Sequence, residues 1–463
     1  MKALLILPPS SSVIREVLET TSPPMNLAYL ASSLELDGHE VKILDSLAMG
    51  YGFEDVLREA KAFNPDLVGL TATTPTVYDA YKVADMIKQE LPDAKTVIGG
   101  PHVSFMARES LEECPSLDIV VRGEGEETIR ELAWRLEKGR SLKDVRGITY
   151  RDGKVIKENE DRPFIKDIDS IPLPAYHLLP MDRYRMGNFS FCTMLTSRGC
   201  PYNCIFCSSS KLMGKIWRAR SVEAVLDELR LLHDKYRVRE VEFLDDTFTL
   251  HMKRAEAIAE GMVREGLDIG WGCSSRANTM NERLAKALRK AGCHSVYVGV
   301  ESATQRMLDF IKKGITIDQV VRAFKILRET GFNTVATFIL GIPGETKELI
   351  MRTIRFAKKL KPTFAQFTIF TPYPGTEAYN MAVREGWLIT RDWSKFDTLT
   401  PVMKLPGLSP KDLKMLLSRA YLSFYLAPSY ILETFRKRHF FIFRKAFKAL
   451  TQYLSAKFSM RGG

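Results

Sequence analysis

The sequence predicts an α/β protein of two successive units, a doubly wound domain and a partial parallel barrel, with a helical, basic C-terminal region. Three observations support this prediction: β-rich runs alternate with helical patterns before residue 145, a proline-rich segment interrupts them, and the alternation resumes after residue 190. A chain of 463 residues is also too long for one ordinary hydrophobic core. Its 45% hydrophobic and 27% charged residues are typical of a globular protein.

The first unit, residues 1–145, is expected to form a five-stranded parallel sheet with helices on both faces. The helical patterns act as crossover connections, and such connections make successive strands parallel. The β-rich runs cover residues 3–7, 40–45, 66–72, 95–100 and 117–123, and the amphipathic patterns lie near residues 25–37, 53–63, 77–91, 104–113 and 125–138.

Residues 146–190 are expected to connect the two units. They begin with a hairpin pattern over residues 147–158, whose turn is Asp152-Gly153. Regular structure is then interrupted over about twenty residues, because proline fixes φ and lacks a backbone N–H. The prolines concerned are Pro163, Pro172, Pro174 and Pro180.

The second unit, residues 191–390, repeats a strand-helix pattern six times. This predicts a partial, TIM-like (β/α)6 barrel whose reactive residues lie at the carboxyl ends of the strands. Polar and glycine-rich pieces follow the strands in this way, among them Cys200, Asp245-Asp246, Arg276 and Glu301. The six β-rich runs cover residues 191–197, 240–246, 269–275, 294–301, 333–340 and 364–371.

Three cysteines, Cys200, Cys204 and Cys207, lie in the short stretch TSRGCPYNCIFC. Three thiolates can hold three irons of a cubic cluster and leave the fourth iron without a protein ligand. A structural zinc site needs a fourth ligand, and Cys192 lies roughly 26 Å away along a strand at about 3.3 Å per residue. A zinc loop or unused buried cysteines remain the alternatives. The other cysteines are scattered, which favours reduced thiols and a cytosolic protein.

This C-x-x-x-C-x-x-C pattern, with Phe206 before the last cysteine, resembles the signature of the radical S-adenosylmethionine (SAM) superfamily. The resemblance implies that Cys200, Cys204 and Cys207 bind a 4Fe-4S cluster and that SAM chelates its open iron. Reductive cleavage of SAM would then give a 5′-deoxyadenosyl radical, which abstracts hydrogen from an unactivated carbon. It also implies an electron donor such as ferredoxin or flavodoxin. The protein would supply orientation and exclude water.

The resemblance also suggests which residues hold SAM, whose ammonium, carboxylate and ribose hydroxyls need partners. Asp245 and Asp246 stand where the superfamily contacts the amino group, but Leu-Asp-Asp replaces the commoner Gly-Gly-Glu, so either aspartate is possible. Arg276 is a candidate for the carboxylate and Glu301 for the ribose. A helix cap, a surface position or an ion pair would also explain these residues. The other expected SAM contacts are Phe206, Gly341, Ile342, Pro343 and Gly344.

The N-terminal pattern PPMNLAYLASSLELDGHEVKILD, followed by VGLTATTPT, IGGPHVS and VVRGEGEETI, resembles the cobalamin-binding domain fused ahead of one radical SAM subclass. The resemblance covers residues 1 to about 390. The loops after the third, fourth and fifth strands form the crevice in which a doubly wound sheet binds its ligand. Glycines there let the backbone approach a flat macrocycle. The candidate contacts are Thr71, Thr73, Thr74, Gly99, Gly100, His102, Gly123, Glu124 and Gly125.

One feature departs from cobalamin domains that supply a lower axial histidine. Those domains carry Asp-x-His-x-x-Gly after the first strand, whereas this loop reads Leu7-Pro8-Pro9-Ser10-Ser11. Any cobalamin is therefore expected to lack a histidine lower ligand, and some relatives keep the domain without binding cobalamin. We expect His102 to satisfy a loop carbonyl instead.

The C-terminal region, residues 391–463, carries most of the net charge of +11. From Lys411 onward there are eleven Lys or Arg residues against Asp412 and Glu433, so the body is nearly neutral, which disfavours nucleic acid as a partner. A basic amphipathic helix on an anionic membrane is predicted by the stretch RKRHFFIFRKAFKALTQYL. The alternative is that its aromatic side chains pack on the barrel. No apolar run reaches the roughly 18 residues of a membrane span, and the N-terminus lacks a signal-peptide pattern. We expect a cytoplasmic protein, peripheral at the inner face of the membrane.

Together these features predict a radical SAM enzyme that modifies an unactivated carbon of a hydrophobic, lipid-like substrate. The reaction would be cobalamin-dependent methyl transfer or radical cyclisation with carbon–carbon bond formation, since the subclass includes hopanoid methylases, tetraether-lipid modifying enzymes and the anaerobic magnesium-protoporphyrin ester cyclase. A methylthiotransferase acting on transfer RNA would need three cysteines in the first unit, and only Cys114 is there. A non-catalytic cobalamin or redox sensor is the other alternative.

Overall fold

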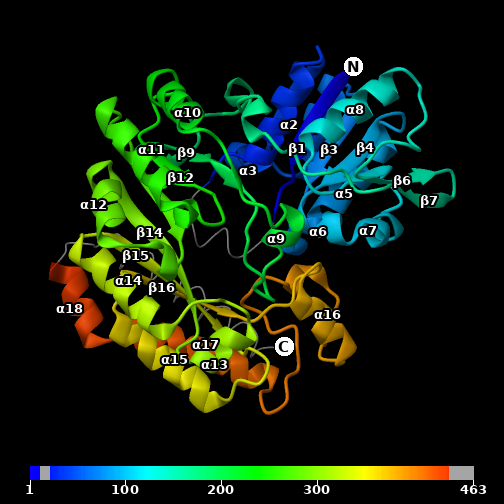
Figure 1. Ribbon diagram of the computed structural model, residues 1–463. Coiled ribbons are helices and arrows are strands. Elements are labelled where there is room, and N and C mark those ends of the chain that lie inside the picture. Colours follow the sequence, from blue (N-terminus) through cyan, green and yellow to red (C-terminus); the bar gives the residue numbers. More distant parts are fainter. Residues whose placement is uncertain (11–20, 437–463) are drawn as a thin grey trace.

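The computed structural model describes residues 1–10 and 21–436 of the chain (Figure 1). Two seven-stranded sheets organise these residues and lie side by side, the first in blue and cyan and the second in green to yellow (Figure 1). A two-stranded antiparallel ribbon, β10 (Ser197–Arg198) with β11 (Arg218–Ala219), belongs to neither sheet. The predicted two-unit α/β architecture is therefore confirmed.

The first sheet has the order β2-β1-β3-β4-β5-β6-β7, with β1 to β5 parallel. This order reverses direction between β1 and β3, where a doubly wound sheet opens its ligand crevice. Residues 3–6 of β1 are completely buried, as expected of a central parallel strand. The strands are β1 (Lys2–Leu7), β2 (Glu40–Asp45), β3 (Leu67–Thr71), β4 (Lys95–Gly99), β5 (Ile119–Val121), β6 (Ile148–Asp152) and β7 (Val155–Glu158).

The helices of the first unit match the amphipathic patterns, except that the pattern near residues 104–113 is split in two. Local caps set their ends: α4 begins where the Asp55 carboxylate accepts the Gly52 N–H at 2.9 Å, and it ends at Asn64 in the left-handed region. The helices are α2 (Met25–Glu35), α3 (Ser46–Met49), α4 (Phe53–Phe63), α5 (Val77–Glu90), α6 (Pro101–Phe105), α7 (Ala107–Glu113) and α8 (Glu126–Glu137).

The β6–β7 hairpin differs from expectation in its partner. The sequence analysis placed it in the connecting segment, but β6 pairs antiparallel with β5 and extends the first sheet. Burial explains the pairing, because Ile148, Thr149 and Tyr150 are all buried and β5 would otherwise present an unpaired edge. An isolated hairpin pattern does not specify the strand on which the hairpin docks.

The proline-rich connector holds only short elements: η2 (Ile168–Ser170), η3 (Tyr176–Leu178) and β8 (Arg185–Met186). Two completely buried tyrosines tie it to both units. The Tyr184 hydroxyl donates to Asp45 of β2 at 2.8 Å, and the Tyr176 hydroxyl donates to Glu228 in the second unit. The connector is thus anchored to the first unit through Tyr184 and to the second through Tyr176.

The second sheet has the order β16-β15-β14-β13-β12-β9-β8, and its six strands β9 to β16 are parallel. The six predicted strands are confirmed, and the sheet is open, with β16 and the antiparallel β8 at its edges. The strands are β9 (Phe189–Met194), β12 (Glu240–Phe243), β13 (Gly270–Ser275), β14 (Cys293–Glu301), β15 (Asn333–Leu340) and β16 (Phe364–Ile369). The helices are α9 (Ser209–Leu212), α10 (Val222–Asp234), α11 (Met252–Arg264), α12 (Glu282–Lys290), α13 (Gln305–Phe310), α14 (Ile317–Glu329), α15 (Lys347–Leu360) and α16 (Glu377–Arg384).

Two C-terminal helices, α17 (Pro410–Tyr425) and α18 (Pro428–Arg436), close the described chain. Their tyrosines reach the free edge of β16. The Tyr421 hydroxyl bonds to the N–H and C=O of Phe367 at 3.2 and 2.9 Å, and that of Tyr425 to those of Ala365 at 3.2 and 3.0 Å. The Tyr430 hydroxyl donates to the Thr363 carbonyl at 3.1 Å.

Tyr421, Tyr425 and Tyr430 therefore pack on the barrel, whereas both alternatives for RKRHFFIFRKAFKALTQYL stay predictions. The basic aromatic stretch that follows lies outside the described residues. Within residues 1–10 and 21–436, no helix combines the length and apolar character that crossing a bilayer requires.

Candidate active site and cofactor cavity

The three cysteines of the sequence motif lie on one loop between β10 and α9. All three are partly buried and none forms a disulfide. The Cys200 N–H donates to the Gly214 carbonyl at 3.0 Å, and the Ile205 N–H to the Ile311 carbonyl at 3.1 Å. Gly199 has φ +89°, and a Cβ there would collide with the Ile216 carbonyl oxygen. The loop therefore needs glycine directly before its first cysteine.

The thiols of this loop suit an iron-sulfur cluster. Burial raises the pKa of the Cys200 and Cys207 thiols, and Asp246 and the neighbouring cysteines add to the rise. Among the described residues, no three His, Cys, Asp or Glu side chains converge as ligands of a single ion. A cubic cluster does not need such convergence, because each thiolate binds a different iron. Cys192 is buried in β9, with its thiol facing the Thr193 carbonyl, so it does not join the loop.

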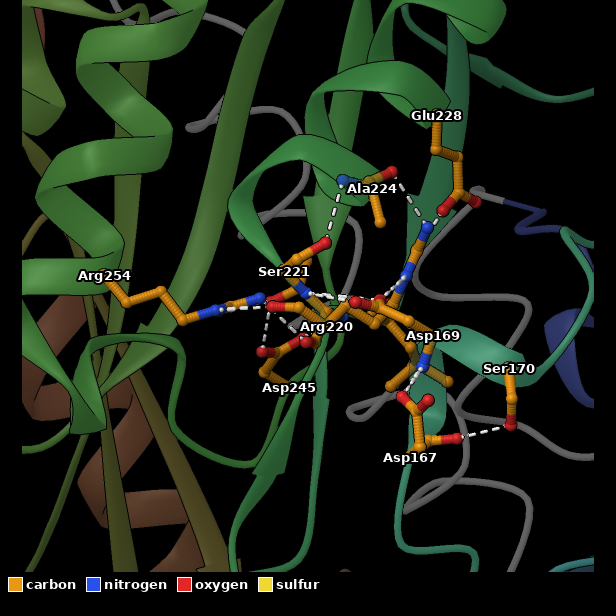
Figure 2. Close-up of polar contacts among 11 residues, drawn as sticks. Asp167, Asp169, Ser170, Arg220, Ser221, Ala224, Glu228, Asp245 and Arg254 are labelled. Atoms are coloured by element: carbon orange, nitrogen blue, oxygen red, sulfur yellow. Dashed lines mark hydrogen bonds and ion pairs between the residues drawn. The ribbon is translucent and has the colours of Figure 1, made fainter.

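Asp245, directly after β12, anchors the start of this loop (Figure 2). Its carboxylate is almost completely buried and accepts the Thr196 N–H and hydroxyl, both at 2.7 Å, and the Ser197 hydroxyl. Arg254 of α11 donates to the Thr196 carbonyl at 2.9 Å. These bonds explain why β9 ends at Met194, short of the predicted residue 197: the next residues turn away toward β11.

A second network, buried at Arg220 and Glu228, fixes the segment that follows the cysteine loop (Figure 2). The Arg220 guanidinium pairs with Glu228 and donates to the Ala224 carbonyl at 3.0 Å. The Asp169 carboxylate accepts the Ser221 N–H at 2.9 Å, at the start of α10. The residues before the cysteine loop are therefore attached to Asp245 after β12 and to α11, and the residues after it are attached to α10.

Asp246 differs from its neighbour in being exposed. Surrounding protein atoms and Asp245 raise the pKa of its carboxyl, while a hydrogen bond from Ser209 lowers it. Ser209 also accepts a bond from the Cys207 thiol at 3.4 Å. Asp246 is thus the aspartate with a carboxylate open toward the cysteine loop, whereas that of Asp245 is engaged.

Arg276 and Glu301, at the ends of β13 and β14, both face this loop. The Arg276 guanidinium lies 3.4 Å from the ring centre of Tyr202, between the first two cysteines, and its buried Nε has no hydrogen-bond partner. Glu301 pairs with Lys313 at 2.6 Å, and the Lys313 ammonium lies 5.8 Å from the Phe206 ring centre. The ion pair is the structural alternative that the sequence left open for Glu301.

Sequence reasoning missed Tyr202 and Lys313. Tyr202 stands inside the quoted motif and was available as a signal, since an aromatic between cluster cysteines can stack on an arginine. Lys313 carries no such signal, because it follows α13 in an unremarked loop.

The turn after β15 contains four of the expected SAM contacts, Gly341, Ile342, Pro343 and Gly344. The Glu345 carboxylate accepts the Gly341 and Ile342 N–H groups at 2.8 and 3.2 Å. Its other oxygen has no partner, and burial raises the pKa of Glu345 to about 7. Glu345 therefore holds this turn in shape, and sequence reasoning did not single it out.

A cavity of about 740 Å³ opens at the carboxyl edge of the first sheet. Residues flanking the cysteine loop complete its lining: Leu195, Arg198, Leu212 and Met213. Gly100 has φ +111°, and a Cβ there would lie 2.5 Å from the Ala72 carbonyl oxygen, so glycine keeps this wall open. The expected cobalamin contacts that line the cavity are Thr71, Thr73, Gly99, Gly100, Gly123, Glu124 and Gly125.

Thr74 and His102 do not line the cavity. His102 Nδ1 lies 3.3 Å from the Thr74 hydroxyl, rather than from a loop carbonyl, and the ring packs 5.0 Å from that of Trp393. Burial lowers the pKa of His102 to about 4. This histidine is a neutral packing residue beneath the cavity, and none of the described cavity-lining residues is a histidine.

A buried charge cluster joins the cavity to the cysteine loop. Arg198, two residues before Cys200, donates to Glu124 at 3.0 Å and to Glu126 at 2.6 Å. Glu124 also pairs with Arg218 at 2.8 Å. The second oxygen of Glu126 is buried without a partner, and Glu126 lines the cavity. A carboxylate oxygen left unpaired beside a cavity fits a ligand that carries N–H donors, such as the peripheral amides of cobalamin.

Two family profiles match the chain: the radical SAM superfamily over residues 194–357 and the B12 binding domain over residues 11–133. An uncharacterized methyltransferase of Pyrococcus horikoshii is 48% identical over 450 residues, which cover 97% of this chain and 98% of that protein. The chain belongs to the radical SAM superfamily. The anaerobic magnesium-protoporphyrin IX monomethyl ester cyclase of Rubrivivax gelatinosus is 31% identical, over 90% of this chain and 76% of that protein.

A solved structure shares the radical SAM fold and its B12 domain. The methyltransferase TsrM from Kitasatospora setae, with cobalamin and a [4Fe-4S] cluster bound, superimposes with a TM-score of 0.74. The match covers 92% of this chain and 89% of that one, at 20% identity. Fold, enzyme class and the use of a 4Fe-4S cluster with SAM thus agree with the sequence prediction.

Proposed function

We propose that this radical SAM enzyme transfers a methyl group to an unactivated carbon of a hydrophobic, lipid-like substrate, with cobalamin in the cavity. One observation carries the proposal: the cavity is lined both by the loops of the first sheet and by Arg198, Leu212 and Met213 around the cysteine loop. A methyl transfer that uses two cofactors requires them at one site, and this cavity joins the two units. The relative in Pyrococcus horikoshii, named as a methyltransferase, supports the same reaction class.

Once bound, the cluster, SAM and cobalamin supply hydrogen abstraction and the methyl group. Cys200, Cys204 and Cys207 would hold the cluster. The exposed Asp246 carboxylate would accept the SAM ammonium, and the partnerless Nε of Arg276 would donate to its carboxylate. Glu301, whose Oε1 accepts from Lys313, has Oε2 left for a ribose hydroxyl.

Toward cobalamin, the chain offers backbone at Gly99, Gly100 and Gly123 and the free oxygen of Glu126. We propose that Glu124 acts through its ion pairs rather than by touching the cofactor, because both its oxygens are occupied by Arg198, Arg218 and the Ile165 N–H. The described lining of the cavity offers no histidine as a ligand for a bound cobalt.

The substrate class and the partners are inferred from a relative and from the C-terminal sequence. A relative's substrate is a magnesium porphyrin ester, a hydrophobic ring system. The basic aromatic sequence after Arg436 supports peripheral contact with the inner face of the membrane, and an acidic ferredoxin or flavodoxin would supply electrons. We propose a cytoplasmic enzyme that meets a membrane-derived substrate.

Product analysis tests the reaction. The protein is reconstituted without oxygen with iron, sulfide and cobalamin, then given a reductant, methyl-labelled SAM and a total lipid extract. Methyl transfer predicts 5′-deoxyadenosine, S-adenosylhomocysteine and label in the lipid fraction, all absent in Cys204→Ala. Cyclisation is a second candidate, favoured by the ester cyclase relative, and predicts 5′-deoxyadenosine without label transfer. Release of neither product from reconstituted protein would refute both.

A further inference from the structure

A basic groove runs between α14 and α15 on the outside of the second sheet, away from the cavity and the cysteine loop. It has a volume of about 570 Å³. Two helical rows of exposed cations line it, Lys325 and Arg328 on α14 and Arg352, Arg355 and Lys359 on α15. Their spacing of three to four residues places each row on one face of its helix.

The cations of the basic groove lack protein counter-charges. Lys325 approaches Glu329 at 4.0 Å, and in the described part of the chain Arg328, Arg352, Arg355 and Lys359 form no ion pair. Asp318 is the acidic residue in the described lining. Like charges concentrated in this way repel one another, so an anion that enters the groove relieves repulsion as well as forming new bonds.

The floor of the basic groove is apolar. Phe324, Phe356 and Leu360 line it, and Val321 is 47% exposed at its wall. A site for a free inorganic anion has no need of such a floor, whereas a phospholipid presents a phosphate with acyl chains behind it. Arginine also suits phosphate, because its planar donors can bond two oxygens at once.

The chain continues from this region into its most basic sequence. The Tyr430 hydroxyl of α18 bonds to the Thr363 carbonyl, three residues beyond the end of α15, so α18 starts beside the lower end of the groove. Leu432 on α18 is 71% exposed. After Arg436 the sequence contains seven Lys or Arg residues, six aromatics and no acidic residue.

We propose that the basic groove binds the phosphate head groups of an anionic membrane surface. Guanidinium groups of Arg352 and Arg355 meet the phosphates, and the apolar floor accommodates the start of the acyl chains. The basic groove thus gives the folded barrel its own contact with the membrane, independent of the sequence after Arg436. The inference concerns binding alone, so it is tested without catalytic turnover.

Flotation of the full-length protein with lipid vesicles tests the proposal. Vesicles of phosphatidylcholine mixed with phosphatidylglycerol are compared with phosphatidylcholine alone. The double variant Arg352→Gln/Arg355→Gln is expected to bind the anionic vesicles about 25-fold more weakly, because each cation near an anionic surface contributes about fivefold to affinity. The matched control, Lys253→Gln/Lys286→Gln, removes two exposed cations from α11 and α12, neither of which forms an ion pair with a described residue, and should bind like the wild type.

Each result decides the question. Equal loss in both double variants would mean that total charge, and not the groove, drives binding, and would overturn the proposal. Unchanged binding of the groove variant, or no preference of the wild type for anionic vesicles, would overturn it too. Inorganic phosphate that displaces the wild type more than chloride of equal ionic strength would identify the groove as a site for a free anion instead. Failure of methyl transfer would leave the vesicle result standing.

Discussion

Mutation of the two adjacent aspartates after β12 should affect different properties, cluster assembly and stability for Asp245 and SAM affinity for Asp246. Asp245 is engaged by Thr196 and Ser197, whereas Asp246 is exposed beside the cysteine loop. We therefore expect Asp245→Ala to lose the iron-sulfur cluster and stability. Asp246→Asn should keep both and bind SAM more weakly.

The magnitudes follow from the bonds lost. Asp245→Ala leaves the Thr196 N–H buried without an acceptor, which costs about 1–3 kcal/mol, and removes two further bonds to a carboxylate. Part of this stability is regained because the two hydroxyls can rotate to other partners. We therefore expect the free energy of unfolding to fall by about 4 kcal/mol, from a total of about 5–15 kcal/mol. Asp245→Asn keeps an acceptor for the Thr196 N–H and should lose about 1–2 kcal/mol.

Asp246→Asn removes a charge-assisted bond to the SAM ammonium, worth about 1.5–3 kcal/mol, so SAM affinity should fall about 10- to 100-fold. The assays are iron and sulfide content after anaerobic reconstitution, thermal unfolding, and SAM binding by calorimetry. Full iron content and wild-type Tm in Asp245→Ala would refute the anchoring role. Unchanged SAM affinity in Asp246→Asn would refute the assignment of the ammonium.

Three further predictions follow from the described contacts. Glu126→Gln should weaken cobalamin binding about 10-fold, because it replaces a charged hydrogen-bond acceptor with a neutral one. The control Glu127→Gln, on the exposed side of α8, should bind cobalamin like the wild type. Equal cobalamin affinities of the two variants would show that Glu126 is not part of the site. Cys204→Ala should abolish cluster assembly and Cys114→Ala should leave it intact, so iron retained by the first variant would contradict the cluster assignment. Burial raises the pKa of Glu242 to about 8, so between its unfolded pKa near 4.5 and pH 8 the folded chain holds a proton that the unfolded chain has lost. The free energy of unfolding should then fall as pH rises, by at most about 1.4 kcal/mol per pH unit. Glu242→Gln should flatten the profile of Tm against pH. Parallel Tm profiles of the variant and the wild type would contradict the raised pKa of Glu242.

The order of strands and the place of the cysteine loop could be predicted from the sequence, because both depend on local patterns. The β-rich runs alternate with amphipathic helices, and parallel strands put polar residues at one edge. The sequence could not decide between Asp245 and Asp246, since both follow the same strand and only long-range bonds from Thr196 and Ser197 distinguish them.

Other contacts were beyond sequence reasoning for the same reason. The Arg198 cluster joins residues 72 and 74 positions apart, and the docking of the β6–β7 hairpin on β5 depends on burial that a two-stranded pattern does not encode. His102 is a structural residue, as expected, but the partner of its Nδ1 is the Thr74 hydroxyl and not a loop carbonyl.

The tyrosine hydroxyls along β16 have a consequence for the open side of the barrel. An unpaired edge strand normally offers a template on which another chain adds a strand, which invites aggregation. Here the phenols of Tyr425 and Tyr421 occupy the outward N–H and C=O groups of Ala365 and Phe367, and that of Tyr430 occupies the Thr363 carbonyl. The sheet can therefore stop at β16 without further strands, because side chains of α17 and α18 take the place of a neighbouring strand.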